Sequence, residues 1–291
     1  MTVREALTEG AGLIARVLPE TPYLDACLLL AQALGTERSR LLAMLPDPVP
    51  ATMLEEYHAS VARRASGESV AYIIGWREFY GHRFAVDNRV LAPRPETELL
   101  VDTILANLPL PRPADDPRGP VRYHDGFTGS GCVGISLAIE RPDVEVSFSD
   151  VSDDALAVCR ANALSLTGRV LDIRQGRILS AARGVFDAIS ANPPYVGKSL
   201  TEDIAAAGSL EPRLALDGGE AGLDLYPALA GEAFGLLGPG GCLAVEIGDE
   251  QGAAVRDIFA RAGFSDIQVL GDLAGQDRVV LGVKRGPTAD S

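Results

Sequence analysis

The sequence predicts an α/β protein in which a small N-terminal helical bundle precedes a mostly parallel, doubly wound sheet. Three observations lead to this fold class. Apolar residues in residues 1–73 recur at helical spacing. From Val121 onward, short apolar runs alternate with helical segments, a pattern typical of parallel sheets. The last two apolar runs are joined by a short connection, so we expect them to pair as an antiparallel hairpin.

Residues 1–73 are expected to contain four helices, whose apolar positions lie within residues 7–18, 23–30, 41–45 and 53–65. Pro19 and Pro22 separate the first two helices and Gly35 ends the second, because proline and glycine interrupt helical hydrogen bonding. The bundle is expected to dock a partner. A purely stabilising role is an equally open interpretation.

Residues 74–92 are expected to form a β-hairpin linker that turns at Gly81. A helix should open near Pro95, with acidic residues in its first turn, and run to about Asn107. The following stretch, residues 108–120, is rich in proline and acid and reads as a surface linker. Residues 93–291 form the predicted C-terminal domain.

The C-terminal domain has a regular alternation of elements. Strands are expected near residues 121–125, 144–149, 169–174, 185–190, 241–247, 265–270 and 278–284. Helices are expected near residues 131–140, 152–165, 223–237 and 249–262.

Composition and charge narrow the class of protein. The hydrophobic content of 47% is ordinary for a soluble globular protein. The net charge of −14 disfavours a long nucleic acid, which requires a basic face, and favours a small molecule or a protein as partner. No apolar run has membrane-spanning length, and the N-terminus does not resemble a signal peptide. The 4 cysteines lack metal-ligand or redox spacing, so we expect a cytoplasmic protein without disulfides or a metal site.

The most informative stretch is Asn192-Pro193-Pro194-Tyr195, which follows a buried apolar run. Proline cannot continue a central strand, so we expect a rigid tip at the carboxyl end of a strand, where ligands of open α/β sheets bind. A carboxamide oxygen that accepts N–H groups beside a flat ring suits a planar nitrogen nucleophile. The alternative is a proline-rich turn in which Asn192 caps its own backbone.

A glycine-rich turn, Asp125 to Cys132, follows the first predicted strand. Such turns let a ligand approach the free N–H groups at a helix N-terminus. Asp150 ends the next strand, where an acid accepts hydrogen bonds from ribose hydroxyls, although a solvated loop aspartate is the alternative. The turn, the acid and the tip together suggest a nucleoside-containing cofactor beside a nitrogen nucleophile.

Over nearly its whole length, the sequence resembles the HemK/PrmC family of methyltransferases, which modify the glutamine amide nitrogen in the Gly-Gly-Gln loop of peptide-chain release factors. The Asn-Pro-Pro-Tyr tip alone is shared with enzymes that methylate amino groups of adenine or guanine. The stretch Pro93-Arg94-Pro95-Glu96-Thr97-Glu98 is much more specific. Further matches lie in residues 72–81, 211–219, 246–251 and 272–278.

The resemblance implies a class I S-adenosylmethionine-dependent methyltransferase with a seven-stranded Rossmann-like sheet, acting as a cytoplasmic monomer on release factors. The implied cofactor site comprises Phe127, Thr128, Gly129, Ser130, Gly131, Asp150, Arg177 and Asn192. The substrate site comprises Asn192, Pro193, Pro194 and Tyr195.

Catalysis is implied to rest on Asn192, Pro193 and Tyr195. The Oδ1 atom of Asn192 and the carbonyl of Pro193 would accept the two N–H groups of the substrate amide, and Tyr195 would pack on its plane. No general base is required before transfer, because the product sheds its extra proton afterwards.

Two positions depart from the family pattern. Phe127 stands where the family has the first glycine of its turn, and a bulky residue is strained at positive φ. Gly126, one position earlier, offers an alternative place for the turn. Arg177 lies where the family usually places a bulky apolar residue, after an acid, near the adenine. We therefore expect cofactor binding to be weakened or lost while the fold is preserved.

Two alternatives stay open at this point. A nucleobase amino-methyltransferase would use the same tip, but the acidic charge and the lack of a target-recognition domain argue against it. A release-factor-binding homologue with impaired cofactor binding is supported only by Phe127 and Arg177. The histidines His58, His82 and His124 lack metal spacing, and Ser130 lacks the context of a nucleophile.

Overall fold

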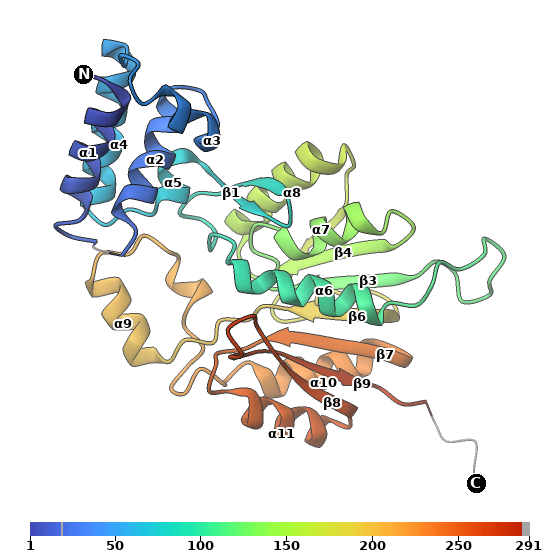
Figure 1. Ribbon diagram of the computed structural model, residues 1–291. Coiled ribbons are helices and arrows are strands. Elements are labelled where there is room, and N and C mark those ends of the chain that lie inside the picture. Colours follow the sequence, from blue (N-terminus) through green and yellow to red (C-terminus); the bar gives the residue numbers. More distant parts are fainter. Residues whose placement is uncertain (19, 287–291) are drawn as a thin grey trace, which may run out of the picture. The chain divides into compact units, whose positions relative to one another are not determined.

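The computed structural model describes residues 1–18 and 20–286 (Figure 1). Pro19, which was expected to separate two helices, lies outside the described residues, as do the last five residues of the predicted C-terminal domain, 287–291. The chain separates into two compact units. The helical unit comprises Met1–Trp76 and Glu202–Leu210, and the sheet unit comprises Arg77–Thr201 and the chain from Glu211 onward.

Within Met1–Trp76, the described residues form the four expected helices and one more. They are α1 (Val3–Ile14), α2 (Pro22–Ala33), α3 (Arg38–Leu41) continued by the 3₁₀ turn η1 (Leu42–Met44), α4 (Ala51–Ala65) and α5 (Val70–Ile74). The assignment of residue 74 to a hairpin linker is wrong, because it ends α5. Gly75, in the left-handed conformation at φ +82, caps this helix and lets the chain turn into a strand.

Packing in the helical unit follows from a few specific residues. Thr2 and Glu5 form a capping box that starts α1, with the Thr2 N–H donating to Glu5 Oε2 at 2.8 Å. Gly10 allows α4 to approach α1, because a Cβ there would lie 1.9 Å from the hydroxyl oxygen of Tyr57. The buried Tyr57 hydroxyl donates to the carbonyl of Ala6 at 3.1 Å.

The expected hairpin follows, with strands β1 (Trp76–Phe79) and β2 (His82–Ala85), and from Arg77 onward it belongs to the sheet unit. Tyr80 and Gly81 form its two-residue turn with φ of 50° and 74°, so the predicted turn at Gly81 is confirmed. The 3₁₀ turn η2 (Pro95–Thr97) and helix α6 (Glu98–Asn107) confirm the helix expected between Pro95 and Asn107.

The main sheet has seven strands in the order β5-β4-β3-β6-β7-β9-β8. They are β3 (Arg122–Gly126), β4 (Glu145–Asp150), β5 (Asp172–Gln175), β6 (Phe186–Ala191), β7 (Leu237–Glu246), β8 (Ser265–Gly271) and β9 (Asp277–Val283). The strands from β5 to β7 are parallel, and β9 is antiparallel to both neighbours. The predicted sheet and its C-terminal hairpin are therefore confirmed. The start expected for β5, residue 169, is wrong because helix α8 runs to Thr167 and Gly168 ends it at φ +65.

Helices cover the two faces of the sheet, as expected for a doubly wound fold. Helices α6, α7 (Cys132–Glu140) and α8 (Asp153–Thr167) contribute to one buried apolar cluster, whereas α10 (Tyr226–Leu236) and α11 (Gly252–Ala262) contribute to a second. Helix α9 (Lys198–Ala206), which was not predicted, carries only one buried residue. Leu200 and Ile204 are its only large apolar residues, and this low apolar content explains the omission.

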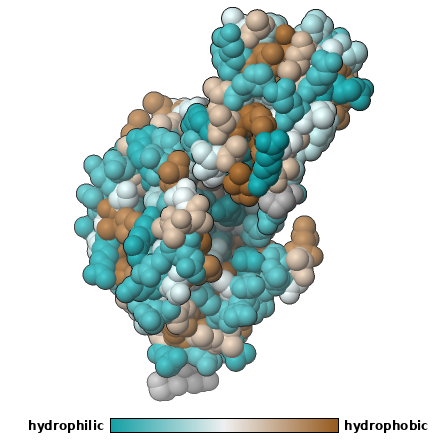
Figure 2. Space-filling model, turned by 90° about the vertical axis from the view of Figure 1, so that its left-hand side faces the viewer, coloured by the Kyte–Doolittle hydropathy of each residue, from teal (hydrophilic) through white to brown (hydrophobic). Residues whose placement is uncertain are grey.

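Polar and apolar residues are interspersed over the face of the molecule shown in Figure 2. In the described part of the chain, no helix is both long and apolar enough to cross a membrane.

Candidate active site

The candidate site lies where the strand order reverses, between β3 and β6. From β3 the chain proceeds to β4 and β5, and then returns to place β6 and β7 on the other side. Ligands of such sheets bind in the crevice outside the carboxyl ends at this point. Gly126 at the end of β3 pairs with Ala191 at the end of β6, so the glycine turn and the Asn192 tip leave the sheet side by side.

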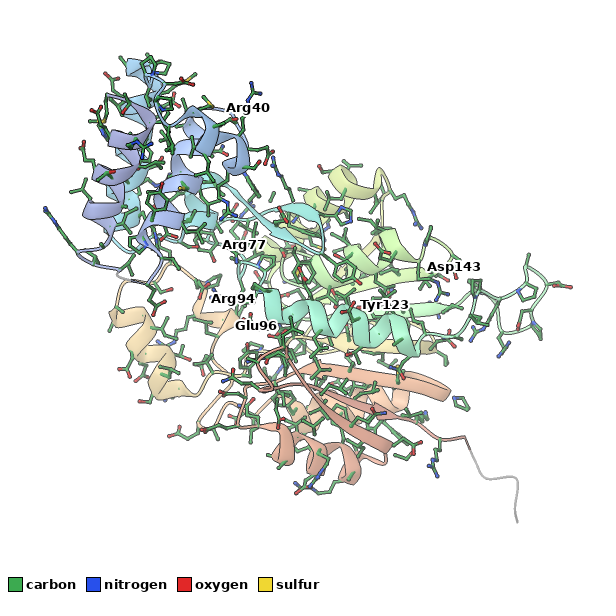
Figure 3. The ribbon with its side chains drawn as sticks, viewed as in Figure 1. Arg40, Arg77, Arg94, Glu96, Tyr123 and Asp143 are labelled. Atoms are coloured by element: carbon green, nitrogen blue, oxygen red, sulfur yellow. The ribbon has the colours of Figure 1, made fainter. Side chains whose placement is uncertain are left out.

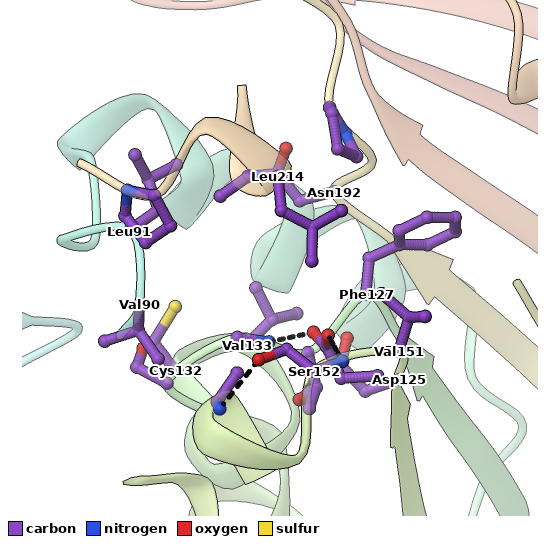
Figure 4. Close-up of a pocket in the computed structure, with 18 of the residues that line it drawn as sticks. Val90, Leu91, Asp125, Phe127, Cys132, Val133, Val151, Ser152, Asn192 and Leu214 are labelled. Carbon is purple, nitrogen blue, oxygen red and sulfur yellow. Dashed lines mark hydrogen bonds between the residues drawn. The ribbon is translucent and has the colours of Figure 1, made fainter. Parts of the chain in front are cut away.

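A cavity of about 330 Å³ opens at this crevice, within the sheet unit (Figure 4). The predicted site residues that line it are Phe127, Thr128, Gly129, Ser130, Asp150, Arg177, Asn192 and Pro194. Three others do not line it: Gly131, Pro193 and Tyr195. Gly131 instead caps the start of α7, and the side chain of Pro193 is buried.

Phe127 adopts the left-handed backbone conformation, with φ +55. The alternative turn at Gly126 is wrong, because Gly126 keeps a negative φ and makes room for Leu179, whose Cδ2 would lie 2.7 Å from an added Cβ. The ring of Phe127 packs against the apolar cluster of α10 and α11. It forms the wall of the cavity across from Leu91 (Figure 4).

Asp150 holds the glycine turn from the neighbouring strand. Its Oδ2 accepts the N–H of Gly129 at 2.9 Å, and its Oδ1 accepts the N–H of Ser152 at 2.9 Å. Burial raises the pKa of this carboxyl, and the backbone N–H groups oppose that effect. Gly129 itself has φ +53 and open space around the position of a Cβ, so the turn leaves room for a ligand.

Asp125, which was not predicted as a site residue, is buried at the carboxyl end of β3 and also lines the cavity. It accepts hydrogen bonds from the hydroxyls of Thr128 at 2.5 Å and Ser190 at 2.7 Å. Tyr123, labelled in Figure 3, contacts the same Ser190 hydroxyl at 2.5 Å. Burial raises the pKa of Asp125 to about 6. An acid at the end of a strand was the available signal for this residue.

The Asn192 tip is supported from behind by a second buried acid, Glu246, at the end of β7. The hydroxyl of Tyr195 donates to Glu246 Oε1 at 3.0 Å. Burial raises the pKa of Glu246, and the neighbouring polar side chains of Thr97, Tyr195 and Asn192 and the charge of Arg278 oppose that effect. Tyr195 therefore faces the interior, which differs from the expectation that its ring packs on a substrate amide in the cavity.

Other contacts hold the tip from its far side. Gln251 Nε2 donates to the carbonyl of Tyr195 at 3.0 Å, and Gln251 Oε1 accepts the N–H of Gly248 at 2.9 Å. Arg94 pairs with Glu211 at 2.5 Å, so the stretch that contains Arg94 and Glu96 (Figure 3) is joined to the loop that follows the tip.

Arg177 lines the cavity and is exposed, whereas the next residue, Ile178, is buried with φ +55. A β-branched residue at positive φ is a genuine conformational outlier, and such residues cluster at functional sites. The sequence carried no signal for it.

The cavity fits S-adenosylmethionine on four structural grounds. An acid, Asp150, stands at the end of the second strand, and glycine at position 129 leaves backbone exposed to the cavity. The lining is largely apolar, as a nucleobase requires, and the carboxamide of Asn192 reaches the same space. Phe127 lines one wall of this cavity of about 330 Å³.

Among residues 1–18 and 20–286, no group of three or more histidine, cysteine, aspartate or glutamate side chains could hold a metal ion. His124 is buried between the hydroxyls of Ser147 and Ser149, each at 2.9 Å, and burial lowers its pKa to about 4. A neutral, fully bonded imidazole of this kind serves the structure of the sheet.

Fold and site together define a class I S-adenosylmethionine-dependent methyltransferase. Residues 5–75 match the family described as PrmC N-terminal domain, and residues 122–210 match the methyltransferase small domain. A methyltransferase structure from Pyrococcus furiosus shares the fold, with a TM-score of 0.52, 18% identity, and coverage of 72% of this chain and 91% of that chain.

Two curated relatives extend over almost the entire chain. The release factor glutamine methyltransferase of Moorella thermoacetica is 40% identical over 289 residues, which are 98% of this chain and 99% of the relative. The enzyme of the same name from Neisseria gonorrhoeae is 40% identical over 268 residues, which are 91% and 94% of the two chains. The chain belongs to the family of release factor glutamine methyltransferases.

Proposed function

We propose that this protein transfers a methyl group from S-adenosylmethionine to the side-chain amide nitrogen of the glutamine in the Gly-Gly-Gln loop of a peptide-chain release factor. The observation that carries the proposal is the convergence of the Asn192 tip and the glycine turn on one cavity at the switch point of the sheet. When bound, the cofactor supplies an electrophilic methyl group.

The roles of the site residues are part of this proposal. Gly129 and Asp150 would hold the cofactor, and Thr128, Ser130, Phe127 and Arg177 line its space. Gly131 would act indirectly, by starting the helix that follows the turn. The exposed guanidinium of Arg177 would lie near the nucleobase. Because it has only hydrogen-bond donors, it cannot accept a bond from the adenine amino group.

A carboxamide nitrogen is a poor nucleophile because its lone pair is delocalised into the carbonyl. Asn192 Oδ1 and the Pro193 carbonyl would accept its two N–H groups and so orient the nitrogen toward the methyl group. Positive charge that develops on the nitrogen is stabilised by these acceptors, and proximity contributes further. Pro194 would shape the wall beside the substrate, and Tyr195 would hold the tip through Glu246.

The experiment is mass spectrometry of a purified release factor after incubation with the protein and S-adenosylmethionine. We expect one added methyl group on the Gly-Gly-Gln glutamine, and none on a matched release factor in which that glutamine is replaced by asparagine. Labelled methyl transfer to DNA or RNA in place of release factor would contradict the proposal.

We also propose that the chain acts in the cytoplasm as a monomer, that residues 1–73 dock the release factor, that residues 75–92, which follow α5, link the domains and that residues 93–291 carry catalysis. The acidic net charge of −14 supports a protein partner over a nucleic acid. Light scattering tests the monomer, and loss of release-factor capture after substitutions on the exposed residues Val17 and Tyr23 tests the docking role.

A further inference from the structure

The carboxylate of Glu246 is an unusual feature behind the candidate site. It is 1% exposed, yet its Oε2 atom has no fully formed hydrogen bond to any described residue. A buried polar atom without a partner is costly, and such atoms require an explanation. Oε1 is already used by the Tyr195 hydroxyl at 3.0 Å, so the explanation concerns Oε2.

The sheet register brings Asn192 beside this carboxylate. Ala191 of β6 pairs with Val245 of β7 in a parallel ladder, so the next residues along the two strands, Asn192 and Glu246, are neighbours at the same edge. Side chains at matched positions of parallel strands project to the same side. The side chains of Thr97 and Asn192 both lie near enough to Glu246 to favour its ionised form, and of the two only Asn192 belongs to the tip.

The main chain fixes the position of Glu246 from two further sides. The hydroxyl of Tyr226 donates to the carbonyl of Glu246 at 2.8 Å, and the N–H of Ile247 donates to the carbonyl of Arg278 at 2.9 Å. Glu246 also pairs with Val279 across the antiparallel β7–β9 ladder. These contacts fix the backbone of Glu246, so the position from which its carboxylate projects is fixed as well.

We propose that Glu246 is a positioning residue that sets which end of the Asn192 carboxamide faces the substrate. An ionised carboxylate only accepts hydrogen bonds, so it selects the Nδ2 end of Asn192 and turns Oδ1 toward the cavity. Oδ1 is the atom that a substrate amide N–H requires. Reversed, the carboxamide would present its own N–H groups to the substrate and repel it. This inference rests on the proposed function for the identity of the substrate.

Of the ionisable groups around Glu246, the others keep their protonation state in acid, so Glu246 is the group that titrates. Tyr195 and Tyr226 have raised pKa values because of burial, so both hydroxyls stay protonated. Arg278 of β9 carries a positive charge that favours the ionised carboxylate and is itself paired with Asp272 at 3.2 Å. Protonation of Glu246 turns an acceptor into a donor and releases Asn192.

The first test follows the Asn192 carboxamide by NMR and needs no substrate. The chain has four asparagines, Asn88, Asn107, Asn162 and Asn192, so a sample with ¹⁵N-labelled asparagine is easily assigned by single substitutions. In the wild type, the Asn192 side-chain resonances should shift as acid protonates Glu246. In Glu246→Gln they should be displaced and independent of pH. Asn192 resonances that are the same in both proteins would overturn the proposal.

The second test is a double-mutant cycle on methyl transfer to release factor. Glu246→Gln should lower kcat by about 100-fold, as expected for a misdirected polar group in a reaction centre, and leave the Kd for S-adenosylmethionine within about twofold. The double variant Asn192→Asp with Glu246→Gln restores an acceptor toward the cavity and a donor behind it. It should recover at least about tenfold of that loss.

Tyr226→Phe is the matched control, because it removes a hydrogen bond to the backbone of Glu246 and leaves the carboxylate intact. It should lower the melting temperature with kcat within about threefold of wild type. Equal losses of kcat in Tyr226→Phe and Glu246→Gln, without recovery in the double variant, would show a merely structural role. A wild-type protein without activity on release factor would refute the proposed function and leave the NMR result to decide this inference.

Discussion

The left-handed backbone at Phe127 makes a quantitative prediction about stability and cofactor affinity. A residue with a Cβ at φ +55 carries a cost of about 1–2 kcal/mol that glycine does not. Glycine loses about 0.5–1 kcal/mol through the greater freedom of the unfolded chain. Taking the middle of each range, Phe127→Gly should therefore be about 0.75 kcal/mol more stable than Phe127→Ala, since both lack the ring and only Phe127→Ala has the Cβ.

Differential scanning calorimetry measures this difference. For a domain of this size, about 1 kcal/mol shifts the melting temperature by about 2–4 °C, so Phe127→Gly should melt about 1–4 °C above Phe127→Ala. If Phe127→Ala melts at the same temperature or higher, the backbone at this position is not strained and the reasoning fails.

Isothermal titration with S-adenosylmethionine tests the consequence for the cavity. If admitting the cofactor forces residue 127 further into conformations that a Cβ disfavours, an added cost of about 1–2 kcal/mol in the wild type corresponds to a Kd about 5- to 30-fold tighter in Phe127→Gly. Equally tight binding by both proteins would contradict weakened cofactor binding and leave Phe127 as a tolerated replacement.

Three further predictions follow from the site and its supports. Burial raises the pKa of Asp125 from 3.8 to about 6. The folded protein therefore binds the Asp125 proton more tightly than the unfolded chain does. This stabilises the fold fully below about pH 3.8, and the stabilisation is lost as the pH rises through about 6. Relative to Asp125→Asn, the wild type should thus lose about 2–3 kcal/mol between about pH 4 and pH 7, measured by denaturant titration. Gln251→Ala removes the bond to the Tyr195 carbonyl and should raise KM for release factor several-fold with an unchanged cofactor Kd. Gly134→Ala should cost about 1–3 kcal/mol, because its Cβ would lie 2.3 Å from a buried ring, whereas Gly231→Ala, with nothing within 4 Å, should stabilise helix α10 by about 0.5–1 kcal/mol.

Each of these has a clear contrary result. If the difference in the free energy of unfolding between wild type and Asp125→Asn does not change with pH, the pKa of Asp125 is not raised. A change in cofactor Kd with Gln251→Ala would assign that side chain to the cofactor side of the tip. Equal melting temperatures for Gly134→Ala and Gly231→Ala would show that α7 can move away from the sheet.

The parts of the fold that could be predicted are those with local causes. The turn at Gly81 follows from the glycine itself, and the end of β6 before Asn192 follows from the two prolines after it. The end of α8 depended on Gly168 and was placed too early, because the helix continues through residues that also suit a strand. Helix α9 has only two large apolar residues, Leu200 and Ile204, and was therefore not recognised as a helix of the domain.

Site residues could be predicted where a residue's position at a strand end indicates its role. They could not be predicted where the role depends on contact with a neighbouring strand. Asn192 and Asp150 were identified from their positions at strand ends. Glu246 reaches the tip only through the parallel register of β6 and β7, which no local pattern contains. Asp125 was overlooked because an acid in a glycine-rich turn is also a common surface residue, and only its burial distinguishes it.

The position of β9, between two strands that precede it in the sequence, has a consequence for biosynthesis. β9 lies between β7 and β8 but follows both in the sequence, so this edge of the sheet cannot close until β9 has been made. During translation, β7 therefore exposes an unpaired edge with apolar residues, which invites association with other chains. A premature stop after β8 would leave that edge open permanently. Such truncated chains should aggregate, although every residue that lines the cavity is present in them.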